Sequence, residues 1–432
     1  MKAIREHSLV RTLVGLRGNP RACIYTEPLW GIPFALYGPF AGVFMVALGL
    51  SGRQIGIVAS VLLFMRAVFS VLGGVLTDKL GRKRATFIFD VLAWSVPCLI
   101  WAFSQNFWWF VVAAAFNGVQ EVTSNSWHCL LVEDADKKKL VDIYAWVHIS
   151  QMLSVFFAPL AGLLISEAGL VLAVRIMYIF SFASMTLKFV ILNKYADETA
   201  VGKVRMTETV GQSIFKLLAG YRAILVRLFR SPGMRLTVIA TTLLLVTGMV
   251  NNLFFNIYAT HTLGIQEEFL AYFPIIRAGI MLLFFFVIQP KMDNFGLKVP
   301  MLLGVSLYLA TYLLLVFIPI GNLSLPLFLT CIFIDSCANG LVLPRRDALQ
   351  ALFIDPQERA RLNSVLAAVT MIVSFPFGFI SGMLSDMDTR YPFILTTVVF
   401  VLLFVVLLTS GALAKKNVRA VEAERELTAQ NT

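Results

Sequence analysis

The sequence predicts an all-α membrane protein with about twelve transmembrane helices in two pseudo-symmetric six-helix bundles. The first observation is composition: 58% of the 432 residues are hydrophobic and only 14% are charged, with a mean hydropathy of +0.80. The second is a series of about twelve apolar stretches, each near the roughly 20 residues that a spanning helix needs. The third is a concentration of Lys and Arg in alternate connections. Since soluble domains carry about 25% charged residues, this chain is expected to lie in a membrane.

The N-terminal half, 27–192, follows a basic tail, 1–26, which we expect in the cytoplasm. Six apolar stretches fill this half, and each ends at charged or turn-forming residues. They predict spanning helices at 27–49, 54–76, 85–103, 107–132, 140–166 and 170–192.

A basic connection, 193–233, separates the two halves. Apolar residues recur at helical spacing between Val210 and Leu228, with basic residues largely between them, which predicts an amphipathic helix on the inner membrane face. Thr209 and Gln212 have the spacing of a capping box at the start of that helix. A plain flexible linker is the alternative.

The C-terminal half, 234–414, repeats the pattern and precedes a second cytoplasmic tail, 415–432. Its apolar stretches predict spanning helices at 235–262, 268–289, 299–318, 325–343, 363–384 and 391–413. With the N-terminus inside, 30 of the 36 Lys and Arg residues fall in inner connections and two in outer ones. This asymmetry places both termini in the cytoplasm. It also explains the net charge of +11, so we expect no nucleic-acid partner.

A short charged turn between the second and third predicted spans carries the strongest motif. It reads Gly-x-x-x-Asp-Lys-x-Gly-Arg-Lys, with the defined positions filled by Gly74, Asp78, Lys79, Gly81, Arg82 and Lys83. A faded copy after the eighth span keeps Asp293 and Gly296. In motif and helix plan, over nearly its whole length, the chain resembles the major facilitator superfamily of transporters.

The resemblance implies a transporter that works by alternating access, with the turn as a gating element. It implies that Asp78 holds the two halves together in the outward-open state. Two departures weaken a drug-exporter assignment. The stretch 113–118 lacks the helix-4 arginine of many proton-coupled exporters, and 158–162 retains little of the exporter motif of helix 5.

The predicted spans contain several ionisable residues, and Arg66, Glu121, Arg277 and Asp335 lie in mid-span, where a charge costs at least roughly 2.5–3.5 kcal/mol on insertion scales. Arg277 follows Arg66 by 211 positions and Asp335 follows Glu121 by 214, so each half carries one arginine and one acid at equivalent places. Either these are structural ion pairs, or at least one borders the substrate path. Glu121 is the best candidate for carrying a proton. Further candidates for a solute cavity are Gln120, Asn252 and Asn256.

Together these patterns predict a secondary active transporter of a small, unidentified solute, proton-coupled and leaning to export. Uptake or exchange of an organic anion is an alternative, because of the arginines. A non-transporting sensor or scaffold with the same fold is another. No nucleophile–base, phosphate-loop or metal constellation is found, so we expect no enzyme activity, cofactor or metal. We expect a monomer in the cell membrane, in contact with lipid.

Overall fold

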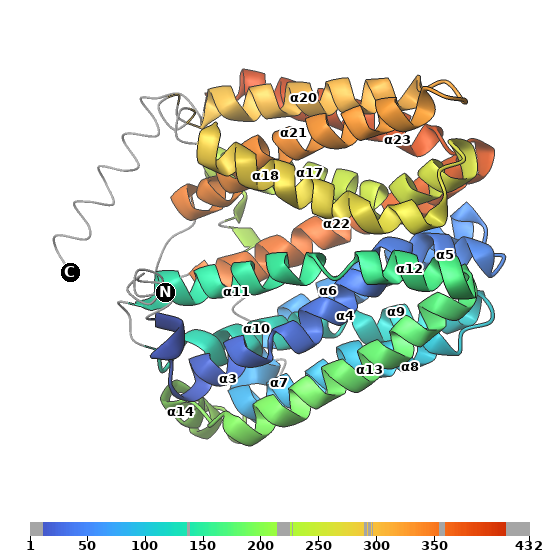
Figure 1. Cartoon of the computed structure of the whole chain (residues 1–432). Helices are drawn as coiled ribbons and strands as arrows, with labels where there is room; N and C mark the ends of the chain where they lie inside the picture. The colour runs from blue at the N-terminus through green and yellow to red at the C-terminus, as the bar shows by residue number, and fades with distance from the viewer. Residues whose placement is uncertain are drawn as a thin grey trace, which may run out of the picture. The chain divides into compact units, whose positions relative to one another are not determined.

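The computed structural model describes residues 12–135, 139–213, 225–226, 228–288, 292, 295, 297–353 and 359–411. These residues form helices joined by short connections, and no strand occurs among them (Figure 1). Ten of the helices are long and apolar enough to cross a membrane. The chain is therefore an integral, multi-pass, all-α membrane protein, and the predicted fold class is confirmed.

The N-terminal half opens with a helix broken by prolines. Pro28 begins a new helix and Pro39 lies in a 3-10 turn, because proline has no N–H to continue the α-helical pattern. The described helices are α3 (Gly18–Thr26), α4 (Pro28–Tyr37), α5 (Ala41–Ala47), α6 (Gly52–Leu80), α7 (Arg82–Asp90), the π-helix η2 (Val91–Ser95), α8 (Val96–Ala102), α9 (Phe107–Asn117), α10 (Gln120–Val132), α11 (Leu140–Val155), α12 (Pro159–Ala168), α13 (Leu170–Tyr195) and α14 (Ala200–Glu208).

The C-terminal half has longer unbroken helices. They are α17 (Pro232–Ile257), continued by the π-helix η4 (Tyr258–Thr262), the 3-10 helix η5 (Glu267–Tyr272), α18 (Phe273–Val287), α20 (Lys298–Val316), α21 (Ser324–Phe353), α22 (Arg359–Met387) and α23 (Tyr391–Thr409).

Two predicted spans, 107–132 and 268–289, are not among the ten qualifying helices. The span 107–132 is interrupted between α9 and α10, where Gly118 packs so closely on Met65 and the backbone of Arg66 that a Cβ would clash. The span 268–289 starts as the 3-10 helix η5 and continues as α18, of 15 residues. Their absence accounts for ten qualifying helices in the described residues where twelve spans were predicted.

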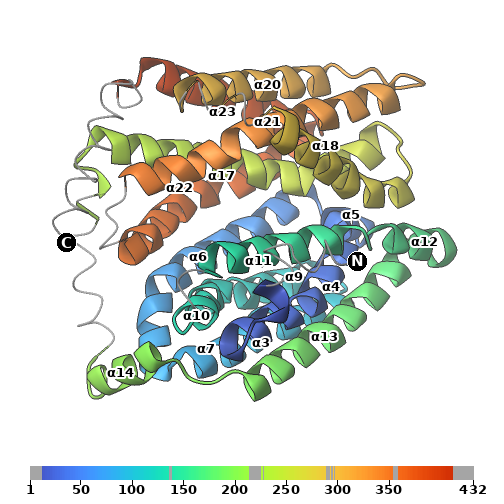
Figure 2. The ribbon, with the colours of Figure 1, turned by 60° about the vertical axis from the view of Figure 1, so that its left-hand side comes forward.

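The first compact unit comprises 1–50, 61–219 and 267–272. Within it, α10 packs against α7, and α13 runs beside α4 and α8 (Figures 1 and 2). Aromatic rings from several helices fill its interior: Tyr178 of α13 lies 4.9 Å from Tyr37, 5.7 Å from Phe44 and 5.4 Å from Trp101 between ring centroids. This packing holds α4, α5, α8 and α13 together.

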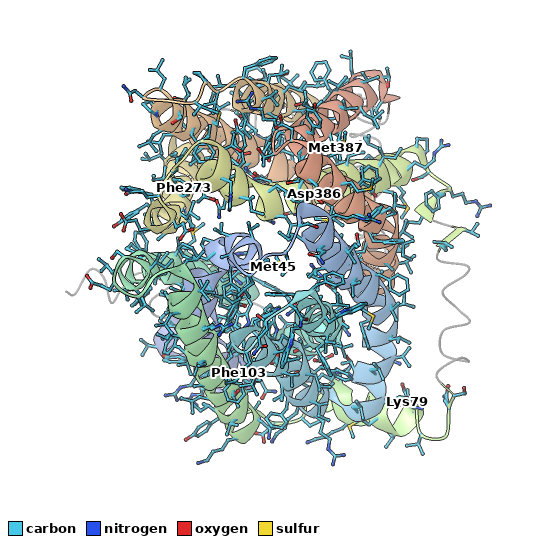
Figure 3. The ribbon with its side chains drawn as sticks, turned by 90° about the vertical axis from the view of Figure 1, so that its right-hand side faces the viewer. Met45, Lys79, Phe103, Phe273, Asp386 and Met387 are labelled. Carbon is cyan, nitrogen blue, oxygen red and sulfur yellow. The ribbon has the colours of Figure 1, made fainter. Side chains whose placement is uncertain are left out.

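The second compact unit comprises 51–60, 220–266 and 273–432. Helix α20 packs on α21 and α23, and α17 packs on α22 (Figure 2). The start of α6 belongs to this unit, where Asp386 at the end of α22 accepts the backbone N–H groups of Gly52 and Arg53 at 2.5 and 2.9 Å (Figure 3). A carboxylate at this point also stabilises the positive end of the α6 dipole.

The connection between the halves differs from the prediction. Thr209 is not the N-cap of a helix: it follows the C-terminal end of α14, and its hydroxyl donates to the carbonyls of Arg205 and Asp78. Helix α14 begins at Ala200, and Thr209 is its C-cap residue. The predicted amphipathic helix lies mostly in residues 214–224, outside the described residues.

Candidate functional site

The turn between α6 and α7 is built around Arg82. Its guanidinium lies 2.9 Å from Asp78 and 3.1 Å from Glu133 of the connection after α10, and Arg82 is only 4% exposed. Gly81 makes the turn with a φ of +83°, a region that favours glycine because it has no Cβ. Arg82 therefore faces inward to two carboxylates, and its charge is balanced within the protein.

The beginning of the linker is docked on this turn. The carboxylate of Glu198 accepts the backbone N–H groups of Arg82 and Lys83 at 2.9 and 3.0 Å, which caps the N-terminus of α7. Lys79 donates to the carbonyl of Gln212 at 2.7 Å, and Figure 3 shows Lys79 at the end of α6 beside the linker helix α14. Sequence reasoning missed this contact, because nothing local to either segment indicates it.

Two of the predicted turn residues, Asp293 and Gly296, lie outside the described residues. Gly74 lies within α6. At its neighbour Gly73, a Cβ would lie 3.2 Å from the carbonyl oxygen of Glu121. This small residue lets α6 approach the backbone of α10.

The first intramembrane charge pair joins α6 to α10. Arg66 Nε donates to Glu121 Oε1 at 2.7 Å, and its Nη2 lies 2.6 Å from the same oxygen. The Arg66 side chain is 31% exposed and that of Glu121 is 14% exposed. The pairing predicted from sequence is therefore present within one unit. Its partial exposure means that the carboxylate is not sealed in the core.

The polar side chains around Glu121 make mostly local hydrogen bonds. Gln120 donates to Asn117 at 3.3 Å, and Asn117 donates to the carbonyl of Ala93 at 2.8 Å. Asn125 donates to Thr77 of α6 at 3.3 Å. These hydrogen bonds satisfy the polar side chains of α9 and α10 and hold the two helices against their neighbours.

The second charge pair joins α18 to α21. Arg277 Nη1 lies 3.5 Å from Asp335 Oδ2, and the guanidinium lies 4.8 Å from the centre of the Phe255 ring. Asn339 donates to the same Asp335 oxygen at 3.1 Å. Asp335 is 2% exposed, whereas the Arg277 side chain is 26% exposed. This pair is looser than the first, and the arginine shares its charge with an aromatic face.

The asparagines predicted on the seventh span lie on α17 in the second unit. Asn252 is exposed and Asn256 is half-buried. Their neighbour Asn251 has a buried side-chain oxygen with no hydrogen-bond partner among the described residues. All the described site residues are thus placed, but each unit brings together only its own pair.

A third ion pair was not foreseen. Lys188 of α13 lies 2.8 Å from Glu27, the residue before α4, and both side chains are 6% exposed. The sequence shows a lysine within a predicted span, which signals an intramembrane partner. Finding that partner requires the fold, because the two residues are 161 positions apart.

Comparison with known proteins agrees with this architecture. The family model for the Major Facilitator Superfamily matches residues 30–344 and 238–430. The multi-drug resistance efflux pump PmrA of Streptococcus pneumoniae is 31% identical over 112 residues, 25% of this chain and 28% of the relative. The multidrug resistance protein MdtG of a Rahnella strain is 30% identical over 96 residues, 21% of this chain and 23% of the relative.

These curated matches therefore span only about a quarter of each relative. Among solved structures, the nucleoside transporter NupG superposes with a TM-score of 0.68 at 16% identity, covering 91% of this chain and 99% of that one. The likeness concerns the fold. The family match extends over most of the chain, and this chain belongs to the major facilitator superfamily of membrane transporters.

Proposed function

We propose that this transporter exports amphiphilic small molecules in exchange for protons, by alternating access of a single chain in the cell membrane. The partial matches to PmrA and MdtG, both named for multidrug resistance, support export of such molecules. The family's alternating-access mechanism implies that the turn at Gly74–Lys83 gates one side.

The Arg66–Glu121 pair is the observation that carries the coupling. A carboxylate and a guanidinium attract each other as opposite charges, and a proton on the carboxylate removes that charge–charge attraction. Since Glu121 is tied to α6 through Arg66, a proton on Glu121 frees the arginine and loosens the α6–α10 contact. Partial exposure gives water access to the pair. Asp335 is a less accessible second acid, at 2% exposure.

The test uses purified protein in liposomes with an imposed pH gradient and a fluorescent lipophilic cation as the probe. The wild-type protein should move the dye against its gradient, driven by protons. Glu121→Gln should abolish the pH dependence and leave the thermal unfolding midpoint close to wild type. Glu167→Gln changes an exposed acid of α12 and should behave as wild type. If Glu121→Gln keeps a normal pH dependence, Glu121 is only structural.

Arg277 favours a second candidate, movement of an organic anion. Its guanidinium is 26% exposed and sits 3.5 Å from its acid, so it retains donors for a carboxylate or sulfonate. An anionic fluorescent dye in the same liposomes distinguishes the two. Anion transport that is lost in Arg277→Gln supports this candidate, whereas transport of the cation alone argues against it. A protein that moves neither probe would point to the sensor or scaffold alternative.

A further inference from the structure

A buried cluster of charges in the first unit lies apart from both intramembrane pairs. It contains Glu27 directly before α4, Asp90 at the end of α7 and Lys188 of α13. Their exposed fractions are 5%, 6% and 5%. The Glu27–Lys188 distance is 2.8 Å, and Thr123 of α10 donates to Asp90 Oδ1 at 2.7 Å. Asp90 lines a crevice together with Phe189, the residue after Lys188 on α13, which places this acid beside the segment of α13 that carries the base.

The ammonium group of Lys188 contacts the Glu27 carboxylate and two aromatic rings. The ammonium nitrogen of Lys188 lies 5.8 Å from the centre of the Trp30 ring and 5.7 Å from that of Trp127. Such faces stabilise a desolvated cation. The charge of Lys188 is therefore balanced once, by Glu27, and the carboxylate of Asp90 is left over.

Several other charges on the surrounding helices have partners of their own. On α10 and the connection after it, Glu121 binds Arg66 and Glu133 binds Arg82. The π-helix η2 after α7 carries no charge. Two other groups lie near Asp90: the thiol of Cys23 on α3, and Lys83 at the start of α7. Arg21 of α3 lies over the Tyr25 ring, and His128 of α10 contacts the carbonyl of Ser124. On α13, Arg175 contacts Ser104 and Lys194 contacts Tyr195.

With all three groups ionised, the cluster would hold one uncompensated negative charge in a low-dielectric interior. An unpaired buried ion costs several kcal/mol, whereas a neutral carboxyl that is hydrogen-bonded costs far less. A single proton removes the imbalance. Because the groups interact closely, that proton belongs to the cluster as a whole, with Asp90 as its principal carrier.

We propose that the Glu27–Lys188–Asp90 cluster is a proton-binding site. A proton from water adds to the Asp90 carboxylate to give a neutral carboxyl group, and it returns to water on release. Asp90 borders a narrow crevice together with Lys83, Thr86 and Phe87 of α7 and Asn193 of α13, and Lys83 is partly exposed. The crevice runs beside the gating turn.

The site is placed to act on that turn, and this role rests on the proposed proton-coupled function. Helix α7 begins at Arg82 in the turn and ends at Asp90 in the cluster, nine residues in all. Loss of the proton would leave a negative charge on Asp90 that repels Glu27 and attracts Lys188. A shift of the Asp90 end of α7 would then be transmitted to the turn at its other end, where Arg82 binds Asp78 and Glu133.

The test measures proton binding without transport. Infrared spectra of purified protein in detergent report the C=O stretch of a protonated carboxyl, followed as a function of pH. Wild-type protein should show a buried carboxyl band at neutral pH that disappears in alkali. Asp90→Asn should lose the band amplitude of one carboxyl group, because an amide has no carboxyl C=O. The amide has the same shape as the neutral acid, so the variant should still fold. Glu121→Gln should retain it.

Thermal unfolding gives an independent readout. The wild-type midpoint should fall as the pH is raised through deprotonation of the cluster, and the Asp90→Asn midpoint should lack that fall. Thr123→Val removes the hydroxyl that stabilises the carboxylate, so its band should persist to higher pH, which keeps the test decisive if Asp90→Asn does not fold.

An unchanged carboxyl band in Asp90→Asn, or one lost in Glu121→Gln instead, would overturn the assignment. These outcomes are separate from the failure of the proposed function. A protein that shows the Asp90 band but never moves a dye would reject export and keep the proton site. Dye transport by a protein that lacks the Asp90 band would reject the proton site and keep export.

Discussion

At the scale of single residues, three basic side chains inside this membrane protein each have a carboxylate nearby. Lys188 and Arg66 lie within 2.8 Å of their acids, and Arg277 lies 3.5 Å from Asp335. Pairing is expected, since an isolated charge in a membrane interior is costly. The three differ in exposure, and exposure decides which can exchange protons or meet a solute.

The Arg66–Glu121 pair makes a stability prediction. Arg66→Ala leaves Glu121 without its cation and should lower the free energy of unfolding by a few kcal/mol, below the roughly 3–5 kcal/mol of a fully buried pair. The double variant Arg66→Ala/Glu121→Ala should recover most of that loss. Thermal unfolding in detergent measures both. A single variant with the wild-type midpoint would show that the pair contributes nothing to stability.

At the scale of elements, glycines set how closely helices approach. A Cβ on Gly56 of α6 would clash with the carbonyl of Gly378 in α22, and one on Gly382 would clash with Gly52. Backbone cannot move aside as a flexible side chain can. The crossing of α6 and α22 inside the second unit therefore depends on glycine at these positions.

Substitution at that crossing should destabilise the protein. Gly56→Ala should cost about 1–3 kcal/mol, the usual penalty of overpacking, and lower the unfolding midpoint. Gly248→Ala in α17 is the matched control, because a Cβ there meets nothing within 4 Å. Equal midpoints for the two variants would contradict a tight crossing.

The docked linker makes a second prediction at this scale. Glu198→Ala removes the cap on α7 and should cost about 0.5–2 kcal/mol locally. Hydrogen exchange at the amides of Arg82 and Lys83 should then accelerate. Glu208→Ala breaks a pair with Arg205 whose side chains are 52% and 51% exposed, so it should leave these amides unchanged. Unaltered exchange in Glu198→Ala would mean that the cap is not formed in solution.

At the scale of the whole molecule, the chain forms two contact units that do not follow the sequence halves strictly. Residues 51–60 cluster with the second unit and 267–272 with the first. Helix α6 therefore contributes to both, beginning beside Asp386 and ending at the turn before α7.

The topology is a whole-molecule prediction. Both termini should face the cytoplasm, because basic residues concentrate in the connections on that side. In a cysteine-free background, Asn322→Cys should react with a membrane-impermeant maleimide in intact cells, and Lys416→Cys should react only after permeabilisation. The opposite pattern would invert the orientation.

The sequence by itself determined the class of molecule. Apolar stretches of spanning length and a complete loop motif are local properties, so the fold class, the family and the Arg66–Glu121 pairing could all be predicted from it. The docked linker and the Lys188–Glu27 pair could not be predicted, because residues 161 positions apart have no local signal for one another.

Tertiary structure also decided what each charge does. Arg82 belongs to a basic cluster in the sequence, yet its burial between Asp78 and Glu133 makes it an internal cation. Asp90 is an ordinary acid in the sequence, and packing against α10 and α13 removes it from water. The reason is physical: the cost of a charge depends on the dielectric and the partners around it, and only the folded chain sets these.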